Sequence, residues 1–591
     1  MDTSKLAEHV SAEALANINH WLNESKYAEY RDELVKMIED ERWQELEDAF
    51  FKVIEFGTGG RRGTTGVGSN RINRVTVGES AQALCIYAQK SDVTAPQKGI
   101  VIACDTRLSS PELSRHCASV CAANGFKTYI FESFRSTPEL SFAVRHLGCA
   151  AGIVITASHN PPSDNGFKAY WDDGGQLVPP HDKGVLTEAD NVTDIHTVDF
   201  DKAVRDGRVT IVGQEIDDLY ISAVTKEALG TQRNLKIVYS PLHGAGQRNT
   251  LPVLRAAGFT DVIPVESQMV PDGNFPTIEN GKPNPEEQAA NDRAVAEMMS
   301  HRADIAITND PDADRIGVMV RAENEVFYLT GNQSAVLATE YSLRKMQETG
   351  TLTNNHYIVK TIVTTDMMAA IAKKYNVTCY GNLLIGFKYV GEVIRKKEQT
   401  DELFVIGGEE SYGLLKGTYA RDKDGAVGAL PLAEYAADLK AEGKTLKDRL
   451  FELYQEYGLY TERLDTIVCP GAEGFAKMQD TMKKLRAQPP AAVEGHTVTA
   501  ILDYSTLKRT EIASGAEADI DCINGNVVVL EFDNDERRRL TIRPSGTEPK
   551  LKVYSQWFEP VDQESDVENQ YTHLVHKLEG LGETLEGILL Q

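Results

Sequence analysis

Short apolar runs alternate with longer segments of helical periodicity along most of the chain. The run "KGIVIACDTR" (98–107) precedes the amphipathic "SPELSRHCASVCAANG" (110–125), and "NLKIVYSPLHGAG" (234–246) precedes "QRNTLPVLRAAG" (247–258). A third round opens with "HYIVKTIVTTDMMAAIAKKYN" (356–376). Runs of four to eight β-branched residues bounded by turn residues are typical of buried strands, and strands that alternate with helices favour α/β units. The pattern therefore predicts three α/β units.

Both ends of the chain differ from this pattern. Residues 5–50 show helical periodicity with many charges, whereas from about residue 460 strand-like runs such as "NVVVLEF" (526–532) and "KLKVYSQWF" (550–558) dominate. We therefore expect an N-terminal helical extension and a smaller C-terminal α+β domain. The predicted limits are 1–45 for the extension, 46–205, 206–324 and 325–455 for the α/β domains, and 456–591 for the last domain.

Composition narrows the class of protein. A chain of 591 residues exceeds what one hydrophobic core supports. The 88 acidic and 62 basic side chains give a formal charge of -26, which argues against nucleic acid or an anionic membrane as a partner. The sequence contains no stretch of about 18 apolar residues, which a membrane-spanning helix would need. The N-terminal residues also lack the continuous apolar segment of a secretory signal peptide. We expect a cytoplasmic protein, either monomer or homodimer. The eight cysteines are scattered without a C-x-x-C pair, so Cys117 and Cys121 are interpreted as core residues.

The first chemical candidate is Ser158 in "ITASHNPPSDNGFKAY" (155–170). The serine follows an apolar run, and Pro161 and Pro162 disfavour a helix after it, so it is expected on a rigid loop. Ligands of open α/β sheets bind at the carboxyl ends of the strands. The alternative is that Ser158 only satisfies hydrogen bonds of the turn.

The second candidate is "TNDPDADR" (308–315), which places Asp310, Asp312 and Asp314 at alternate positions after an apolar run. Three adjacent carboxylates repel one another unless a cation or solvent compensates, and oxygen ligands suit Mg²⁺. A solvated acidic turn is the alternative. An EF-hand would require Gly at position 315 and Glu at position 321, where arginines stand, so that motif is excluded.

Two further loops carry polar clusters after strand-like runs. The loop "GGEESYG" (407–413) offers Glu409 and Ser411 as acceptors for sugar hydroxyls between flanking glycines. The loop "RPSGTEPK" (543–550) supplies charged and hydroxyl donors that can bind an anion. Solvated glutamates and an ordinary hairpin turn are the respective alternatives.

Taken in this order, the four loops resemble those of the α-D-phosphohexomutase superfamily, most closely its bacterial phosphoglucomutase branch. The resemblance covers roughly residues 50–590. It also includes "FGTGGRRG" (56–63), "SPLHG" (240–244), "PNPEE" (283–287), "LLIGFKYVG" (383–391) and "YARDKDG" (419–425). The resemblance implies three α/β domains of mixed sheet and a C-terminal domain similar to the TATA-binding protein around one central cleft.

The resemblance also implies a reaction and a set of residues. Ser158 would carry a phosphoryl group and exchange it with a sugar phosphate through a glucose 1,6-bisphosphate intermediate, which also acts as activator. One Mg²⁺ would be bound by Ser158, Asp310, Asp312 and Asp314. The residues implied in catalysis beside Ser158 are Lys168, Lys388, His159 and Arg62. The residues implied in substrate binding are Glu409, Ser411, Arg421, Arg543, Ser545, Gly546, Thr547, Lys550 and Arg315. Thr58 and Gly63 are expected to shape their loop.

The sequence leaves several functions open. Interconversion of α-D-glucose 1-phosphate and glucose 6-phosphate is the expected activity. The same residues would serve a phosphopentomutase or a phosphomannomutase, or a sugar bisphosphate synthase in which Ser158 transfers its phosphoryl group one way. A catalytically silent sugar-phosphate-binding protein is disfavoured, because Ser158, the three aspartates and Arg543 are all present.

Overall fold

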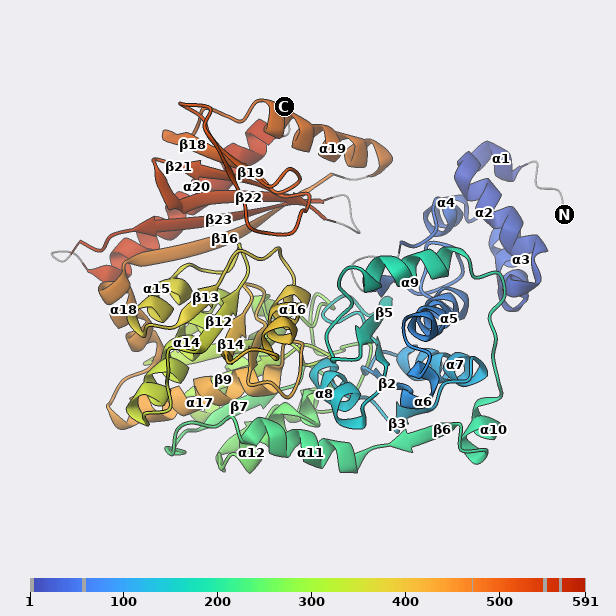
Figure 1. The fold of residues 1–591 in the computed structure, drawn as a ribbon, viewed down its shortest axis with the longest axis horizontal. Helices are drawn as coiled ribbons and strands as arrows, with labels where there is room; N and C mark the ends of the chain where they lie inside the picture. Colours follow the sequence, from blue (N-terminus) through green and yellow to red (C-terminus); the bar gives the residue numbers. More distant parts are fainter. Residues whose placement is uncertain (1–4, 56–59, 470, 546–549, 563–565, 590–591) are drawn as a thin grey trace.

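The computed structural model describes residues 5–55, 60–469, 471–545, 550–562 and 566–589, and it contains four β-sheets that follow one another along the chain (Figure 1). Three of them mix parallel and antiparallel strands and are flanked by helices, which confirms the predicted α/β class. In the view of Figure 1 the N-terminal helices lie at one end of the molecule, beside α5, and the C-terminal sheet lies over the third sheet.

The helical pattern at the N-terminus corresponds to a small helical cluster with its own core around Trp21. Its elements are α1 (Leu6–His9), α2 (Ala12–Asn23), the 3-10 turn η1 (Ser25–Tyr30), α3 (Arg31–Glu39) and α4 (Trp43–Phe50). An ion pair of 2.9 Å joins Lys26 Nζ to Glu79 Oε1 on α5 (Arg74–Ser91). The cluster is therefore attached to the first α/β unit, while the oligomeric state stays a prediction.

The first sheet has the order β1-β5-β4-β2-β3-β6. Its strands are β1 (Gly60–Thr64), β2 (Ile100–Cys104), β3 (Thr128–Phe131), β4 (Ala151–Ile155), β5 (Asp164–Trp171) and β6 (Val209–Val212). Its other helices are α6 (Ala95–Lys98), α7 (Ser110–Ala123), α8 (Thr137–Leu147), α9 (His181–Asp190) and α10 (Phe200–Arg205). Ser158 lies on the turn between β4 and β5, as predicted.

One local prediction was wrong: residues 164–170 were read as part of the serine loop and are strand β5. After Pro161 and Pro162 the chain reverses, and β5 pairs antiparallel with both β4 and β1. Gly60 permits the second pairing, because a Cβ there would lie 1.8 Å from the carbonyl oxygen of Phe167. Lys168 therefore projects from a strand held on both sides and not from a solvated loop.

The second and third sheets carry the acidic loops. The second, in the order β11-β10-β9-β7-β8, consists of β7 (Ile237–Ser240), β8 (Val262–Pro264), β9 (Ile305–Asn309), β10 (Ile316–Ala322) and β11 (Glu325–Leu329). The third, in the order β13-β12-β14-β15, consists of β12 (His356–Lys360), β13 (Thr378–Tyr380), β14 (Leu403–Gly408) and β15 (Leu414–Lys416). The surrounding helices are α11 (Gln214–Thr225), η2 (Ala245–Gln247), α12 (Thr250–Ala256), η3 (Glu266–Gln268), α13 (Gln288–His301), α14 (Gly331–Glu348), α15 (Met367–Lys374), α16 (Phe387–Lys397), α17 (Gly425–Ala441) and α18 (Leu446–Tyr457).

The fourth sheet is antiparallel, with the order β16-β23-β22-β21-β18-β19-β20 and β17 paired to β18. Its strands are β16 (Leu459–Val468), β17 (Ala492–Val493), β18 (His496–Asp503), β19 (Lys508–Glu511), β20 (Glu517–Asp519), β21 (Val528–Phe532), β22 (Asp535–Pro544) and β23 (Lys550–Glu559). Helices α19 (Gly471–Ala487) and α20 (Val567–Leu589) pack on this sheet. Its packing against the third α/β unit buries Tyr389 of α16 with Tyr554 of β23. The likeness to the TATA-binding protein, the central cleft and the domain limits stay predictions.

Cys117 and Cys121 are buried on α7 in the core of the first α/β unit, as interpreted from the sequence. Within the ranges given above, one group of three or more His, Cys, Asp or Glu side chains lies close enough together to hold a metal ion. It consists of Asp310, Asp312 and Asp314. Within those same ranges, none of the helices combines the length and the apolar character that a membrane crossing requires.

Candidate active site

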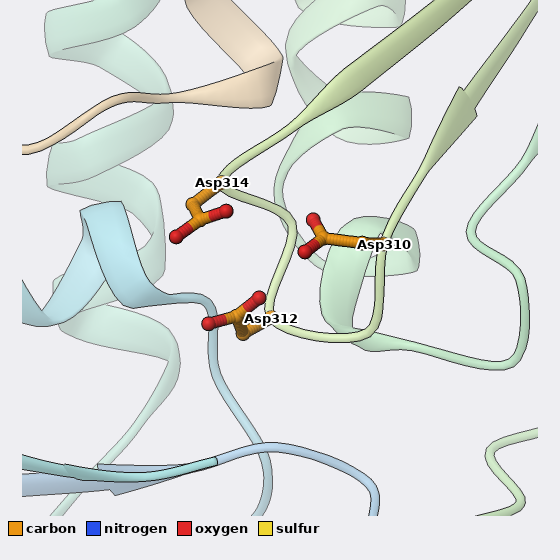
Figure 2. Close-up of side chains that lie close together, drawn as sticks. All are labelled: Asp310, Asp312 and Asp314. Atoms are coloured by element: carbon orange, nitrogen blue, oxygen red, sulfur yellow. The ribbon is translucent and has the colours of Figure 1, made fainter. Parts of the chain in front are cut away.

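The turn after β4 and the turn between β9 and β10 bring Ser158 to the three aspartates. Ligand oxygens of Asp310, Asp312 and Asp314 lie within 4.8 Å of one another, and the three side chains are buried (Figure 2). Ser158 Oγ donates a hydrogen bond of 2.6 Å to Asp310 Oδ2, and it lies 3.1 Å from Nδ1 of His159. A hydroxyl, an imidazole and three carboxylates from two sheets thus form one cluster.

The backbone of Ser158 is strained and held in place by one guanidinium. Its φ of 51° lies in the left-handed region, which costs about 1–3 kcal/mol for a residue other than glycine. Arg107, buried at the end of β2, donates to the carbonyl oxygens of Ser158 and Asn160 at 2.6 Å each. It also reaches the carbonyls of Pro161 at 2.6 Å and Asp164 at 2.9 Å. Arg107 was missed in the sequence, although it is the last residue of the strand-like run 98–107.

The aspartates provide what a divalent cation requires. Burial and the neighbouring carboxylates raise the pKa of Asp310 well above its usual range. Burial acts in the same direction on Asp312, but the ammonium group of Lys168, a hydrogen bond with Asp310 and the charge of Lys423 together outweigh it and lower that pKa. Oδ1 of Asp312 and Oδ1 of Asp314 are buried and have no hydrogen-bond partner among the residues that the structure describes. Buried acceptors without donors fit a hard cation bound through oxygen.

Two lysines balance the acidic charge. Lys168 Nζ on β5 lies 2.8 Å from Asp312 Oδ2 and 3.5 Å from Asp314 Oδ2. Lys423 Nζ lies 3.1 Å from Asp314 Oδ2. In the sequence, Arg421 of "YARDKDG" was selected as a substrate-binding residue, whereas Lys423, two positions further on, was missed. Three adjacent carboxylates require cations nearby, and this requirement could have pointed to Lys423.

Arg421 and Lys388 are not brought to the aspartates. The Arg421 guanidinium is buried, donates to the carbonyls of Thr418 and Ala420, and contacts Glu398. Lys388 lies in the first turn of α16 and forms its ion pair, at 3.5 Å, with Asp182 of α9. Lys388 therefore joins the third α/β unit to the first, whereas the Arg421 side chain stays within the third unit in this conformation.

Two arginines lie close to the triad. Burial lowers the pKa of Arg62 on β1, and the negative charge of Asp312 opposes that shift, which places the guanidinium within electrostatic reach of the triad. The backbone amide of Arg315 donates to Asp310 Oδ1 at 3.0 Å, and its Nη1 lies 2.5 Å from Glu286 Oε1. Glu286 belongs to "PNPEE" and was not singled out from the sequence.

The loop "GGEESYG" (407–413) is fixed beside the triad. The backbone amide of Ile316, the first residue of β10, donates to the carbonyl of Tyr412 at 3.0 Å. Glu409 Oε2 lies 3.9 Å from Lys423 Nζ, and Ser411 Oγ donates to Glu410 Oε1 at 3.4 Å. Burial raises the pKa of Glu409 to about 7, although Lys423 acts in the opposite direction.

The segment "RPSGTEPK" (543–550) begins at the end of β22 and ends at the start of β23. Arg543 stands directly opposite Lys552 in the register of the two strands. Burial and the charge of Arg543 lower the pKa of Lys552. Nε of Arg543 is buried without a hydrogen-bond partner in the described part of the chain. Two half-buried cations side by side are suited to an anion. The Ser545 amide donates to the Lys550 carbonyl at 2.7 Å. Gly546 and Thr547, like Thr58, lie outside the described residues.

Comparison with known proteins supplies the family. Residues 53–196, 218–323 and 330–457 match the models of phosphoglucomutase/phosphomannomutase α/β/α domains I, II and III, together more than half of the chain. A protein named phosphoglucomutase from Staphylococcus epidermidis is 34% identical over 517 residues, covering 86% of this chain and 92% of that protein. Its namesake from Staphylococcus haemolyticus is 34% identical over 536 residues, covering 89% and 95%.

Solved structures show the same fold. A phosphoglucomutase/phosphomannomutase family protein from Burkholderia thailandensis superposes with a TM-score of 0.63 at 18% identity, covering 90% of this chain and 97% of that one. The open form of pp63/parafusin, a phosphoglucomutase from Paramecium, gives a TM-score of 0.62 at 17% identity, covering 90% and 98%. With three matched domain models and relatives that align over most of its length, the chain belongs to the phosphoglucomutase/phosphomannomutase family.

Proposed function

We propose that this protein is a phosphoglucomutase, an intramolecular phosphotransferase that interconverts α-D-glucose 1-phosphate and glucose 6-phosphate. The observation that carries the proposal is the 2.6 Å contact of Ser158 Oγ with Asp310 in a buried triad of carboxylates. The relatives at 34% identity that are named phosphoglucomutase support the choice of glucose. The cytoplasmic location and a sugar phosphate as the partner belong to the same proposal.

The reaction consists of two phosphoryl transfers in opposite directions. The phosphoryl group of phosphorylated Ser158 passes to the 6-hydroxyl of glucose 1-phosphate. The bond from phosphorus to Oγ breaks, a bond to O6 forms, and the hydroxyl proton leaves to a base. The resulting glucose 1,6-bisphosphate turns over in the site. Its 1-phosphoryl group then returns to Oγ, O1 takes up a proton, and glucose 6-phosphate departs.

The carboxylates of Asp310, Asp312 and Asp314 would hold one Mg²⁺ beside Ser158 Oγ. Bound there, the cation supplies positive charge that offsets the charge developing on the transferring phosphoryl group. The left-handed backbone of Ser158, fixed by Arg107, keeps Oγ directed at the triad without a rearrangement during each transfer.

Proton transfer and charge neutralisation fall to the side chains around the triad. Lys168 is the candidate acid and base, because it lies on β5 within reach of Asp312 and can exchange a proton with a sugar hydroxyl. His159 accompanies the Ser158 hydroxyl, and Arg62 and Lys423 add positive charge. Lys388 could act only after its ion pair with Asp182 opens, and Arg421 only after its contact with Glu398 opens.

Substrate recognition is assigned to the other two loops. Glu409 and Ser411 would accept and donate hydrogen bonds to the sugar hydroxyls. Arg543, Ser545, Gly546, Thr547 and Lys550, with Lys552 beside them, would bind the phosphate that is not reacting. Arg315 would face the reacting phosphate. Because the bisphosphate binds in two orientations, one anion site must accept either of its phosphates.

Phosphorus NMR tests the proposal. The protein is incubated with Mg²⁺, a trace of glucose 1,6-bisphosphate and, in turn, glucose, mannose and ribose 1-phosphates. We expect rapid formation of glucose 6-phosphate, slower turnover of the other two sugars, and no reaction with Ser158→Ala. Faster turnover of mannose or ribose 1-phosphate would make the protein a phosphomannomutase or phosphopentomutase. Accumulation of the bisphosphate alone would make it a synthase.

A further inference from the structure

The Asp-Lys-Asp segment, residues 422–424, lies where all three α/β units meet. It belongs to the third unit and leads into α17. Its two aspartates are buried and point to other parts of the chain, whereas the lysine between them reaches the acidic triad of the second unit. The proposal below rests on the proposed function of that triad.

Asp422 is anchored to the first unit. Its Oδ2 accepts hydrogen bonds of 2.8 Å from the hydroxyl of Tyr170 and of 2.8 Å from the side-chain amide of Gln176. Tyr170 is on β5, two residues after Lys168, and in a strand residues two apart share one face. The same face of β5 therefore holds Lys168 on the triad and Asp422 beside it.

Asp424 is anchored on the other side. Its Oδ2 accepts 2.7 Å from the hydroxyl of Tyr220 on α11, the helix between the first and second sheets, and 2.5 Å from that of Tyr419. Its Oδ1 caps α17 by accepting from the amide of Ala426 at 2.8 Å. Tyr220 is fully buried, so its hydroxyl has no water to replace this partner.

The segment also packs directly on the acidic loop. The amide of Gly425 donates to the carbonyl of Ala313 at 3.1 Å. A Cβ at position 425 would lie 2.2 Å from the side-chain nitrogen of Asn309, so only glycine allows this approach. Between these fixed points the Lys423 side chain extends toward the triad, and its Nζ lies 3.1 Å from Asp314 Oδ2.

We infer that Tyr170 and Tyr220 are positioning residues, which fix the Asp-Lys-Asp segment between the first and second units and so hold Lys423 on Asp314. A free lysine side chain loses rotamer entropy when it is held in one place, and an anchored backbone on both sides reduces the freedom that remains. Without either hydroxyl, one buried carboxylate oxygen loses a donor and the segment can shift.

The first test measures kinetics. Tyr220→Phe and Tyr170→Phe each remove one hydroxyl and leave the ring. We expect kcat about 10-fold lower with KM within about twofold, as is usual for groups that orient a reactive side chain. Tyr435→Phe is the matched control, because its hydroxyl also donates to a buried carboxylate, that of Glu340 at 2.5 Å, whereas Tyr435 lies far along α17 from residues 422–424. An equal loss of kcat in this control, or unchanged kcat in both test variants, would overturn the inference.

The second test needs no activity. Thermal unfolding midpoints are compared for the full-length protein, Tyr220→Phe, Lys423→Met and the double variant. Because the hydroxyl acts through Lys423, we expect Tyr220→Phe to lower the midpoint less when Lys423 is already methionine. Additive losses would show that Tyr220 contributes packing alone and would overturn the inference. If the unaltered protein had no mutase activity, the proposed function would fail, while this cycle would still decide the positioning role.

Discussion

Ser158 Oγ and Asp310 Oδ2 lie 2.6 Å apart although they belong to different sheets, the serine to the turn after β4 and the aspartate to the turn after β9. The reaction centre is thus formed at the contact between the first and second α/β units. Thr137, at the start of α8, reinforces this contact: its hydroxyl donates to Asp312 Oδ2 at 2.9 Å. Whatever changes the relative position of these two units changes the distance between the phosphoryl carrier and the acidic triad.

Replacement of Lys423 by methionine is expected to lower kcat about 100-fold, because it removes a buried positive charge next to Asp314. Steady-state kinetics with glucose 1-phosphate measure the effect. Lys416→Met is the control, since Lys416 also forms a buried ion pair, at 2.8 Å with Glu227, away from the triad. The role of Lys423 would be refuted by two variants with the same kcat.

Magnesium is expected to raise the unfolding temperature of the protein, and to do so increasingly as its concentration rises above the dissociation constant, because a ligand that binds only the folded state stabilises it. The Asp314→Asn variant removes one of the two carboxylates of the triad that have an unpaired buried oxygen. We predict a shift with Mg²⁺ for the unaltered protein and none, at the same concentration, for the variant. A full shift in the variant would place the cation elsewhere.

The activity is expected to depend on pH through Glu409. Burial raises the pKa of this carboxyl to about 7, so between pH 8 and pH 6 the ionised fraction falls about 10-fold, and only the ionised form accepts hydrogen bonds at both oxygens. We predict that kcat/KM falls with it. The Glu409→Gln variant, measured on the same substrate so that ionisation of the sugar phosphate cancels, should be lower and lack this step. A step of equal size in the variant would assign the titration to another group.

Stability is expected to depend on pH through His116. Burial lowers the pKa of this imidazole on α7 to about 4, below the value near 6.5 of the unfolded chain. Between those values the unfolded chain binds more protons, so stability rises with pH, and it is lost as pH falls from about 6.5 to 4. The loss approaches about 3 kcal/mol. Unfolding midpoints from pH 7.5 to 4.5 should drop more steeply for the unaltered protein than for His116→Asn. Parallel curves would exclude this contribution.

Strand-and-helix periodicity was sufficient to predict the α/β units and to put Ser158 and the aspartates after strands, because a strand buried on both faces leaves a continuous apolar run. It was not sufficient for β5. That strand contains Lys168 and Gly166 and starts two residues after a pair of prolines, and its pairing with β1 depends on a glycine contact far away in the sequence.

The resemblance of motifs indicated which loops would form the site, but not which side chain of each loop would reach it. In "YARDKDG" the four ionic residues point to different partners: Arg421 to Glu398, Asp422 to Tyr170, Lys423 to Asp314 and Asp424 to Tyr220. These directions are set by the packing of three units around one segment. Arg107 was missed for a similar reason, because its partners are backbone carbonyls, which carry no sequence signal.

The most direct test of the account is the intact mass of the purified protein before and after incubation with glucose 1,6-bisphosphate and Mg²⁺, followed by peptide mapping, with Ser158→Ala alongside. We predict one added phosphoryl group per chain, located on Ser158, and no addition to the variant. A protein that stays unmodified, or one that is phosphorylated at another residue and equally so in Ser158→Ala, would contradict the assignment of Ser158 as the phosphoryl carrier.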